Sequence, residues 1–424
     1  MRTYRSSSRA QMRAFDRLMA ARSRRFPPAV LRTAARIVED VRRRGDAAVV
    51  AAVRRYDGVR LVTRGLRVPP ARIRAAWQAL PAADRRALRA SWDRILAYHR
   101  RQVPRGYRVR TGLGSFTHVI RPLGRVAIHI PAGAAPLVST LLMCAGAARA
   151  AGVRDLVLVS PPRGGQVHPA ILAAAWLAGI REAYNAGGAQ GVAALALGTG
   201  TIRAADRVVG PGNLWSQAAR WITQGAGLDG PSEIAVLADA TARAEAVAAD
   251  LVAQAEHAGD NPAVLVTPSH TLAAAVAMEV GRQLRTLPRA AVARTSFRRF
   301  GATVLVRSLL EGLSVCERFA PEHLAIVARG ADRLARRARC AGTVLIGASS
   351  PVAAADYGVG PNHVLPTAGT ARYASGLGVK DFLKFVNLTR LSARGLKAAG
   401  PGLARIARME GLEGHARSLE INRG

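Results

Sequence analysis

The spacing of apolar positions along the chain changes near residue 125. Before that point, apolar residues recur every three or four positions through 30–59 and 81–102, and we predict that residues 1–110 are helical. Gly45 interrupts the first of these segments and indicates a break in the helix. His99 lies among charged residues in the second segment, and we predict that its side chain is solvated at the surface.

From residue 125 onward, short apolar runs end in Gly or Pro and alternate with Ala-rich helical segments. The runs form two groups, at 125–131, 155–161, 182–188 and 207–212, and after Gly230 at 233–239, 262–268, 302–308, 323–328 and 342–348. Strands that alternate with helices predict parallel, doubly wound sheets. Two such groups indicate two α/β domains with a crevice between them, where ligands bind beyond the carboxyl ends of the strands. From about Gly376 the chain returns to a basic pattern that we predict to be helical.

Length and composition narrow the class of protein. The 424 residues are enough for two or three domains, and half of them are hydrophobic. No run of ~18 uncharged apolar residues occurs, so we predict no membrane-spanning helix, and the basic, Ser-rich start lacks the apolar core of a secretory signal. The three widely separated cysteines, Cys144, Cys316 and Cys340, indicate reduced thiols and a cytoplasmic protein.

The net charge of +35 is unusual, with 62 Lys and Arg against 27 Asp and Glu. Only Lys380, Lys384 and Lys397 are lysines, so arginine carries almost all of the positive charge. Such a charge suits nucleic acid, but the arginines are spread along the chain and no DNA- or RNA-reading motif is present. We interpret the charge as a compositional bias. A basic nucleic-acid-binding protein remains an alternative, which predicts steeply salt-dependent binding.

Two glycine-rich strand ends, Gly187–Gln190 and Gly210–Asn213, have a backbone that can approach a phosphate. No Gly-x-Gly-x-x-Gly follows a strand and opens a helix, and ordinary tight turns explain both loops about as well. These loops alone therefore do not establish a dinucleotide cofactor.

Gln254 and His257 close an Ala-rich helical run at 241–258, just before Gly259. Residues three apart lie on one face of a helix, so we expect the amide and the imidazole to point the same way. Both groups are plausible ligands of one metal ion, and neutral imidazole suits Zn²⁺. The alternative is a capped helix end with two solvated side chains.

Three further stretches are more polar than a turn requires. Adjacent Glu322 and His323 precede a predicted strand and can transfer protons near neutral pH. Asp356 and His363 share a Gly- and Pro-rich loop, and His415 lies near the C-terminus. The alternatives are an exposed loop for each of the first two stretches and, as the default interpretation of His415, a surface residue on a terminal helix. A possible zinc set with nitrogen and oxygen ligands comprises Gln254, His257, Asp356 and His415. The spacing of these residues is too wide to demonstrate it.

These polar stretches lie within longer pieces that resemble the histidinol dehydrogenase family, and the match covers most of the chain. The most specific pieces are D-L-V-A-Q-A-E-H, F-A-P-E-H-L-A-I and D-Y-G-V-G-P-N-H-V-L-P-T, with G-P-S-E-I-A-V-L-A-D-A and a terminal L-E-G-H in support. The resemblance implies two incomplete Rossmann-like α/β/α domains with helical N- and C-terminal segments. The expected boundaries are a helical arm at 1–22, a first α/β domain at 23–122 plus 235–375, a second, NAD-side domain at 123–234, and a C-terminal segment at 376–424. Most of the zinc ligands and the catalytic residues would belong to the first domain.

Carried over position by position, the resemblance implies one zinc ion per subunit and NAD as the cofactor. The implied zinc ligands are Gln254, His257, Asp356 and His415. The implied catalytic pair is Glu322 and His323. The implied substrate contacts are Ser232, His363 and Glu410. The implied cofactor contacts are His129, Gln190 and Asn213.

The implied reaction is the four-electron oxidation of L-histidinol to L-histidine through L-histidinal, with two NAD⁺, at the end of histidine biosynthesis. In this scheme His323 takes the alcohol proton and Glu322 activates a water molecule against the aldehyde. The family exchanges its C-terminal segment within a homodimer, so Glu410 and His415 are expected to complete the site of the neighbouring subunit.

Some positions depart from the family pattern. His129 stands where the family usually has Tyr, Ala132–Gly133 replaces two glycines, and the segment 227–229 before Ser232 is about three residues shorter than usual. These departures lie on the cofactor side and beside a substrate contact. They leave open a paralogous zinc and NAD dehydrogenase that acts on another small amino alcohol or polyol, although the retained substrate contacts favour histidinol.

Overall fold

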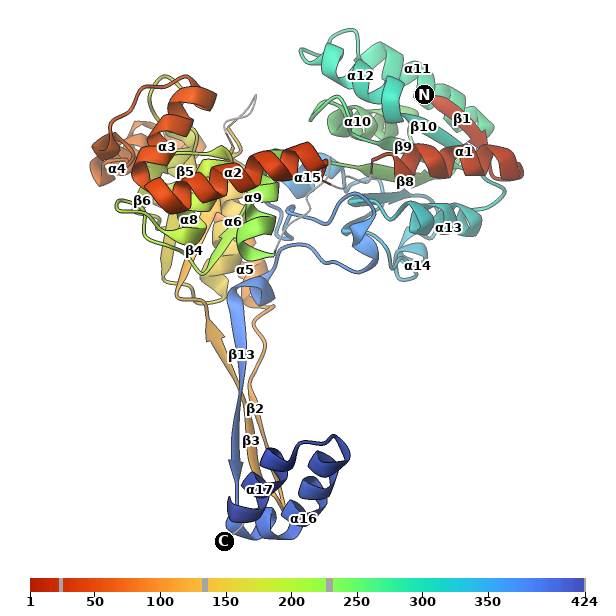
Figure 1. Cartoon of the computed structure of the whole chain (residues 1–424). Helices are drawn as coiled ribbons and strands as arrows, with labels where there is room; N and C mark the ends of the chain where they lie inside the picture. The colour runs from red at the N-terminus through yellow and green to blue at the C-terminus, as the bar shows by residue number, and fades with distance from the viewer. Residues whose placement is uncertain (23–25, 132–135, 226–231, 423–424) are drawn as a thin grey trace.

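The chain forms two α/β bodies and a long stalk that carries two helices at its far end (Figure 1). The computed structural model describes residues 1–22, 26–131, 136–225 and 232–422. The prediction of two doubly wound parallel sheets is confirmed. Among these described residues, no helix is long and apolar enough to cross a membrane.

The first body is built on a six-stranded sheet in which every pairing is parallel. Its strands, in spatial order, are β1 (Arg2–Arg5), β10 (Ala302–Leu305), β9 (Ala263–Thr267), β8 (Ile234–Ala238), β11 (His323–Val327) and β12 (Thr343–Ile346). One face packs against α1 (Arg9–Ala20), α13 (Leu309–Phe319) and α14 (Ala331–Ala335). The other face packs against α10 (Ala244–Ala255), α11 (His270–Gln283), α12 (Ala290–Phe300) and α15 (Val352–Asp356). The central strands are buried on both faces, which is why they read as continuous apolar runs.

The second body is built on a four-stranded parallel sheet in the order β6 (Glu182–Asn185), β5 (Asp155–Ser160), β4 (Arg125–His129) and β7 (Arg207–Val209). Val126 and Ile128 face one apolar cluster, and Ala127 between them faces the other, as the alternation of a strand requires. The first cluster contains α4 (Pro70–Ala79), α5 (Ala82–Arg100), α6 (Val138–Ala150) and α7 (Pro169–Leu177). The second contains α2 (Pro28–Arg44), α3 (Asp46–Ala52), α8 (Gly188–Leu197) and α9 (Leu214–Gln224). Short helical turns lie at η1 (Val53–Asp57) and η2 (Thr63–Gly65).

The packing differs from the expected domain boundaries. Residues 23–122 were expected to pack with 235–375, but helices α2 to α5 cover the two faces of the four-stranded sheet. Their apolar stripes, such as Val38 and Val49, find partners among the Ala-rich helices of that body. The segment 1–22 is likewise not a separate helical arm. Residues 2–5 form an edge strand parallel to β10, and Phe15 of α1 is buried in the core of the first body.

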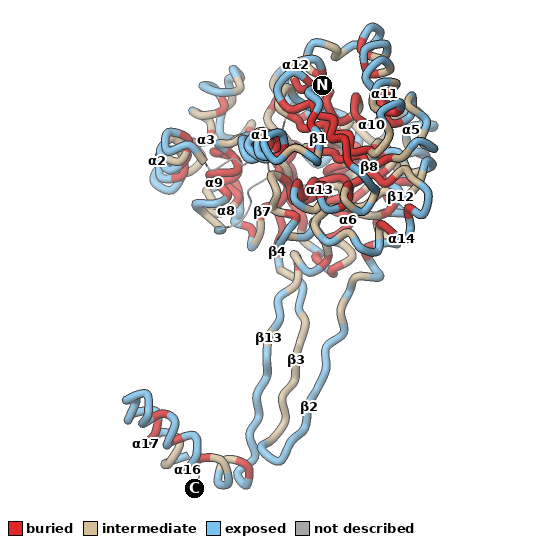
Figure 2. The backbone as a smooth tube through the Cα atoms, turned by 90° about the vertical axis from the view of Figure 1, so that its right-hand side faces the viewer, coloured by how far each residue is buried: buried red, intermediate tan, exposed pale blue. Residues whose placement is uncertain are grey.

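The stalk is an antiparallel sheet of β2 (Tyr107–Thr111), β3 (Gly114–Pro122) and β13 (Leu383–Leu391), followed by α16 (Ala393–Met409) and α17 (Glu413–Asn422). Two short turns, η3 (Thr370–Arg372) and η4 (Val379–Phe382), lie before β13. The prediction of a helical tail from about Gly376 is therefore wrong for 383–391. That segment pairs with β3 along its whole length and is largely exposed (Figure 2). At ~3.4 Å per residue, such a strand carries the C-terminal helices about 30 Å away from the bodies.

Candidate active site

The buried acid–base pair lies at the start of β11, where the chain turns out of α13. Glu322 is 5% exposed and His323 2% exposed. The Glu322 Oε2 atom accepts a hydrogen bond of 2.9 Å from the backbone N–H of Glu233. His323 Nδ1 lies 3.3 Å from the backbone oxygen of Glu233 and 3.5 Å from Glu322 Oε2. Burial opposes the charged form of His323, but the carboxylates of Glu322 and Asp356 outweigh it and raise the pKa of His323. The pair is thus built to hold a proton.

Asp356 and His363 lie on the open side of this pair. Asp356 Oδ1 is 4.0 Å from His323 Nε2 and 4.0 Å from His363 Nδ1. His363 Nδ1 donates to the backbone oxygen of Asp356 at 2.7 Å, and its Nε2 accepts from the Thr140 hydroxyl at 3.0 Å. Burial lowers the pKa of His363. Thr140 belongs to α6 of the second body, so the site lies where the two α/β bodies meet.

Gln254 lies near the C-terminal end of α10 and is 1% exposed. Its Oε1 and Nε2 atoms have no hydrogen-bond partner among the described residues. Helix α10 packs against α15, which ends at Asp356, and Asp250 Oδ1 of α10 accepts a 3.0 Å hydrogen bond from Val352 N at the start of α15. Two of the four predicted metal ligands therefore stand on neighbouring helices, and one of them has an unsatisfied buried amide.

The other two predicted ligands lie elsewhere. Helix α10 ends at Ala255, so His257 falls beyond the helix and is exposed, whereas Gln254 is buried. The expectation that they share a helix face is wrong for this reason. His415 in α17 is exposed at the far end of the stalk, as is Glu410 (Figure 1). Within the described part of the chain, no group of three or more His, Cys, Asp or Glu side chains is arranged to hold a metal ion.

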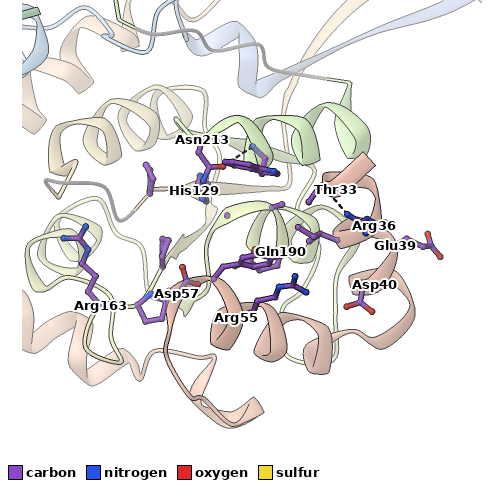
Figure 3. A pocket seen from close by; sticks show the side chains of 18 of the residues that line it. Thr33, Arg36, Glu39, Asp40, Arg55, Asp57, His129, Arg163, Gln190 and Asn213 are labelled. Atoms are coloured by element: carbon purple, nitrogen blue, oxygen red, sulfur yellow. Dashed lines mark hydrogen bonds between the residues drawn. The ribbon is translucent and has the colours of Figure 1, made fainter. Parts of the chain in front are cut away.

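The three predicted cofactor contacts do converge. His129 at the end of β4, Gln190 in α8 and Asn213 at the start of α9 line one cavity of about 1270 Å³ in the second body (Figure 3). His129 Nδ1 donates to the backbone oxygen of Pro211 at 2.9 Å, while its Nε2 has no partner among the described residues. Burial lowers the pKa of His129 to about 4, so the ring is neutral near pH 7. Gln190 is 2% exposed, and the Asn213 side chain caps α9 by accepting from the backbone N–H groups of Trp215 and Ser216.

The opposite wall of this cavity consists of residues that were not predicted from the sequence. Charged side chains from α2 and η1 line it, namely Arg36, Glu39, Asp40, Arg43, Arg55 and Asp57. Burial raises the pKa of Asp57 to about 6, and its Oδ2 atom has no partner among the described residues. No motif marks these residues, because their role depends on how α2 packs against α8 and α9.

Ser232 and two altered segments were also singled out in the sequence. Ser232 is partly exposed just before β8, next to the buried Glu233. The altered Ala132–Gly133 pair and the shortened segment 227–229 lie outside the described residues.

The prediction that His99 is solvated is wrong. Its ring is fully buried, donates from Nδ1 to Ile95 O at 2.7 Å, and accepts at Nε2 from Asn362 Nδ2 at 3.2 Å.

Taken together, two parallel α/β bodies, a proton-holding pair between them and a separate cavity beyond the strand ends of one sheet define an α/β oxidoreductase. The profile described as Histidinol dehydrogenase matches residues 20–423. The chain belongs to the histidinol dehydrogenase family, and the prediction that it is a dehydrogenase of this family is confirmed.

Individual relatives agree with this assignment. The chain is 44% identical over 415 residues to the histidinol dehydrogenase of Bradyrhizobium diazoefficiens, covering 96% of each chain. It is 41% identical over 408 residues to that of Thermus thermophilus, covering 95% of this chain and 97% of the relative. The crystal structure of histidinol dehydrogenase from Elizabethkingia anophelis superimposes with a TM-score of 0.91 at 31% identity, covering 100% of this chain and 98% of that one.

Proposed function

We propose that this protein oxidises L-histidinol to L-histidine through L-histidinal, using zinc and two NAD⁺ per turnover. The observation that carries the proposal is the buried Glu322–His323 pair facing Asp356 and His363 at the junction of the two bodies. Oxidation of an alcohol requires a group that removes the hydroxyl proton, and oxidation of the resulting aldehyde requires an activated water molecule. An imidazole and a carboxylate held side by side meet both requirements.

His323 accepts the alcohol proton through Nε2, the ring atom that lies 4.0 Å from Asp356 Oδ1 and has no hydrogen-bond partner among the described residues. Its Nδ1 is held by the backbone oxygen of Glu233 and by Glu322, so the ring is oriented for this transfer. Glu322 then accepts a proton from the water that attacks the aldehyde. NAD⁺, when bound, would supply the hydride acceptor for each of the two oxidations.

Gln254 and Asp356 are placed to bind one zinc ion, whereas His415 could join them only from a second chain. Both amide atoms of Gln254 are buried without a partner, as expected of a side chain that completes its contacts with an ion, and Asp356 stands on the adjacent helix. His257 is exposed, two residues beyond the end of α10. His415 lies at the end of a stalk about 30 Å long and cannot reach Gln254 of its own chain. A bound ion would supply fixed positive charge that orients the substrate and polarises its hydroxyl.

We therefore propose a homodimer in which Glu410 and His415 enter the site of the other subunit, beside Ser232 and His363 as substrate contacts. The stalk and its helices expose apolar side chains that a monomer would leave in water. These include Phe385, Leu388, Ile406 and Met409. Exposed apolar area of this kind marks a surface that binds protein.

The cavity with His129, Gln190 and Asn213 fits NAD. Its volume of about 1270 Å³ accommodates a dinucleotide, and it lies at the carboxyl end of β4, where doubly wound sheets bind such ligands. His129 Nε2 and Gln190 offer buried polar groups to the ligand, while the arginines of α2 and η1 offer positive charge to its phosphates.

Two experiments test this proposal. The first compares NADH formation from L-histidinol with that from other small amino alcohols and polyols, beside a chelated sample and a His323→Ala variant. Turnover that is fastest with histidinol and absent in both controls supports it. Turnover only with another alcohol would instead favour a paralogous dehydrogenase.

The second experiment mixes two inactive variants, His323→Ala and His415→Ala. If the C-terminal segment is exchanged, the hybrid dimer contains one site with both residues intact, and activity returns on mixing. Hybrid dimers that form but stay inactive would contradict the exchange.

A further inference from the structure

Glu233 contacts both members of the acid–base pair and two further segments beside it, although the sequence analysis assigns it no role in the chemistry. It is fully buried, directly before β8. Its backbone N–H donates to Glu322 Oε2 at 2.9 Å. Its backbone oxygen accepts from His323 N at 3.1 Å and lies 3.3 Å from His323 Nδ1. One peptide segment therefore sets the position of both members of the pair.

The side chain of Glu233 fixes that segment in turn. Its Oε1 accepts a short hydrogen bond from the backbone N–H of Ala368, at the end of the loop that carries Asp356 and His363. Its Oε2 lies 3.1 Å from Nη1 of Arg22, and both side chains of this ion pair are almost fully buried. Without this partner, the Glu233 carboxyl group would be buried with no compensating positive charge.

Arg22 extends the same connection to the other side of the pair. Its guanidinium lies 4.0 Å from the centre of the Phe319 ring and donates to the Phe319 backbone oxygen. Phe319 ends α13, and Ala320, which follows with φ of 49°, starts the turn into Glu322. Arg22 therefore contacts the segment before Glu322 directly. Through its ion pair with Glu233, it also contacts the peptide segment that binds Glu322 and His323.

We propose that Arg22 and Glu233 are positioning residues that hold Glu322 and His323 in their reactive geometry. This inference rests on the proposed function of that pair. Neither residue lines the cofactor cavity. They act through the peptide of Glu233 and the turn at Phe319–Ala320, and thereby make the N-terminal segment a part of the active site.

The test compares Arg22→Met with Arg22→Lys and with a double variant, Arg22→Met with Glu233→Gln, all as full-length, zinc-loaded protein. Misplacement of a reacting group by about 1 Å costs up to ~100-fold in rate. We expect kcat of Arg22→Met to fall ~10- to 100-fold, with KM for histidinol and for NAD changed by less than ~3-fold. Arg22→Lys should retain more of kcat than Arg22→Met, because the ammonium group can still pair with Glu233. The recovery should be partial, because an ammonium group cannot also donate to the Phe319 backbone oxygen as the guanidinium does.

The double variant separates positioning from stability. Glu233→Gln removes the buried carboxyl group that Arg22→Met leaves without its ion-pair partner, so the double variant should unfold at a higher temperature than Arg22→Met, while its kcat stays low. Arg318→Met is the matched control. It removes an exposed ion pair with Asp16, 3.7 Å long, that also joins α13 to α1, and it should leave kcat unchanged.

A folded Arg22→Met protein with wild-type kcat would overturn the inference. So would a kcat that recovers with stability in the double variant. A wild-type protein that forms no NADH from histidinol would overturn the proposed function instead, so the two failures are distinguishable.

Discussion

Replacing Gln254 by Met should make the metal-free protein more stable. Gln254 is 1% exposed, and neither of its amide atoms has a hydrogen-bond partner among the described residues. Burying an amide without compensation costs roughly 1–3 kcal/mol. Methionine has a similar volume and no such cost, so we expect the free energy of unfolding to rise by about 1–3 kcal/mol when a chelator is present.

Zinc should narrow this difference in stability between the two proteins. An ion that binds only the folded state at a free concentration of about 100 times its Kd stabilises by ~2.7 kcal/mol. Loss of the Gln254 ligand should weaken binding at least tenfold, which removes about 1.4 kcal/mol of that stabilisation. The assay is urea unfolding at fixed protein concentration, with chelator and with saturating zinc, for both proteins.

Gln217→Met is the matched control. Gln217 is also buried and its Oε1 likewise has no partner among the described residues, but its Nε2 donates to the backbone oxygen of Gly212 at 2.7 Å and it lies outside the predicted metal site, so its replacement should change stability equally with and without zinc. The reasoning would be refuted if metal-free Gln254→Met were less stable than wild type, or if zinc stabilised both proteins to the same extent.

Further predictions concern pH and packing. Burial lowers the pKa of His129 from 6.5 to about 4, so the folded protein keeps this ring neutral where the unfolded chain would protonate it. Up to about 3 kcal/mol of unfolding free energy should therefore be lost as the pH falls from 6.5 towards 4. In urea unfolding followed against pH, His129→Asn should lack this part of the slope, and an unchanged slope would contradict the burial argument. Gly146→Ala would place a Cβ 2.5 Å from Ile95 Cγ2 between α5 and α6, and should cost about 1–3 kcal/mol of unfolding free energy. Gly281→Ala in α11 meets open space and should instead gain about 0.5–1 kcal/mol, and a loss there would show that helix propensity does not govern the site.

The parts of the fold that were predictable are those in which burial imposes a sequence pattern. Strands β4, β5, β8 and β9 are buried on both faces and are continuous apolar runs. The stalk leaves no such pattern, because β13 is solvated along most of its length and is specified by a partner strand more than 260 residues away. Likewise, the apolar stripe of α2 shows which face of the helix is buried but does not reveal which sheet it covers.

The same distinction applies to the site. Glu322 and His323 could be identified because two polar residues interrupt an apolar region just before a strand. His99 was misjudged from its charged neighbours, yet it lies one helical turn beyond the buried Ile95 and shares that face. Glu233 was missed because its role depends on backbone hydrogen bonds to residues 89 and 90 positions away.

The most direct test of the account is a count of NADH formed from a limiting amount of L-histidinol by the zinc-loaded protein. A four-electron oxidation predicts two NADH for each histidinol consumed, with histidine as the product and no NADH from His323→Ala. One NADH per histidinol with free aldehyde, or no NADH from a folded, zinc-bound protein, would contradict it.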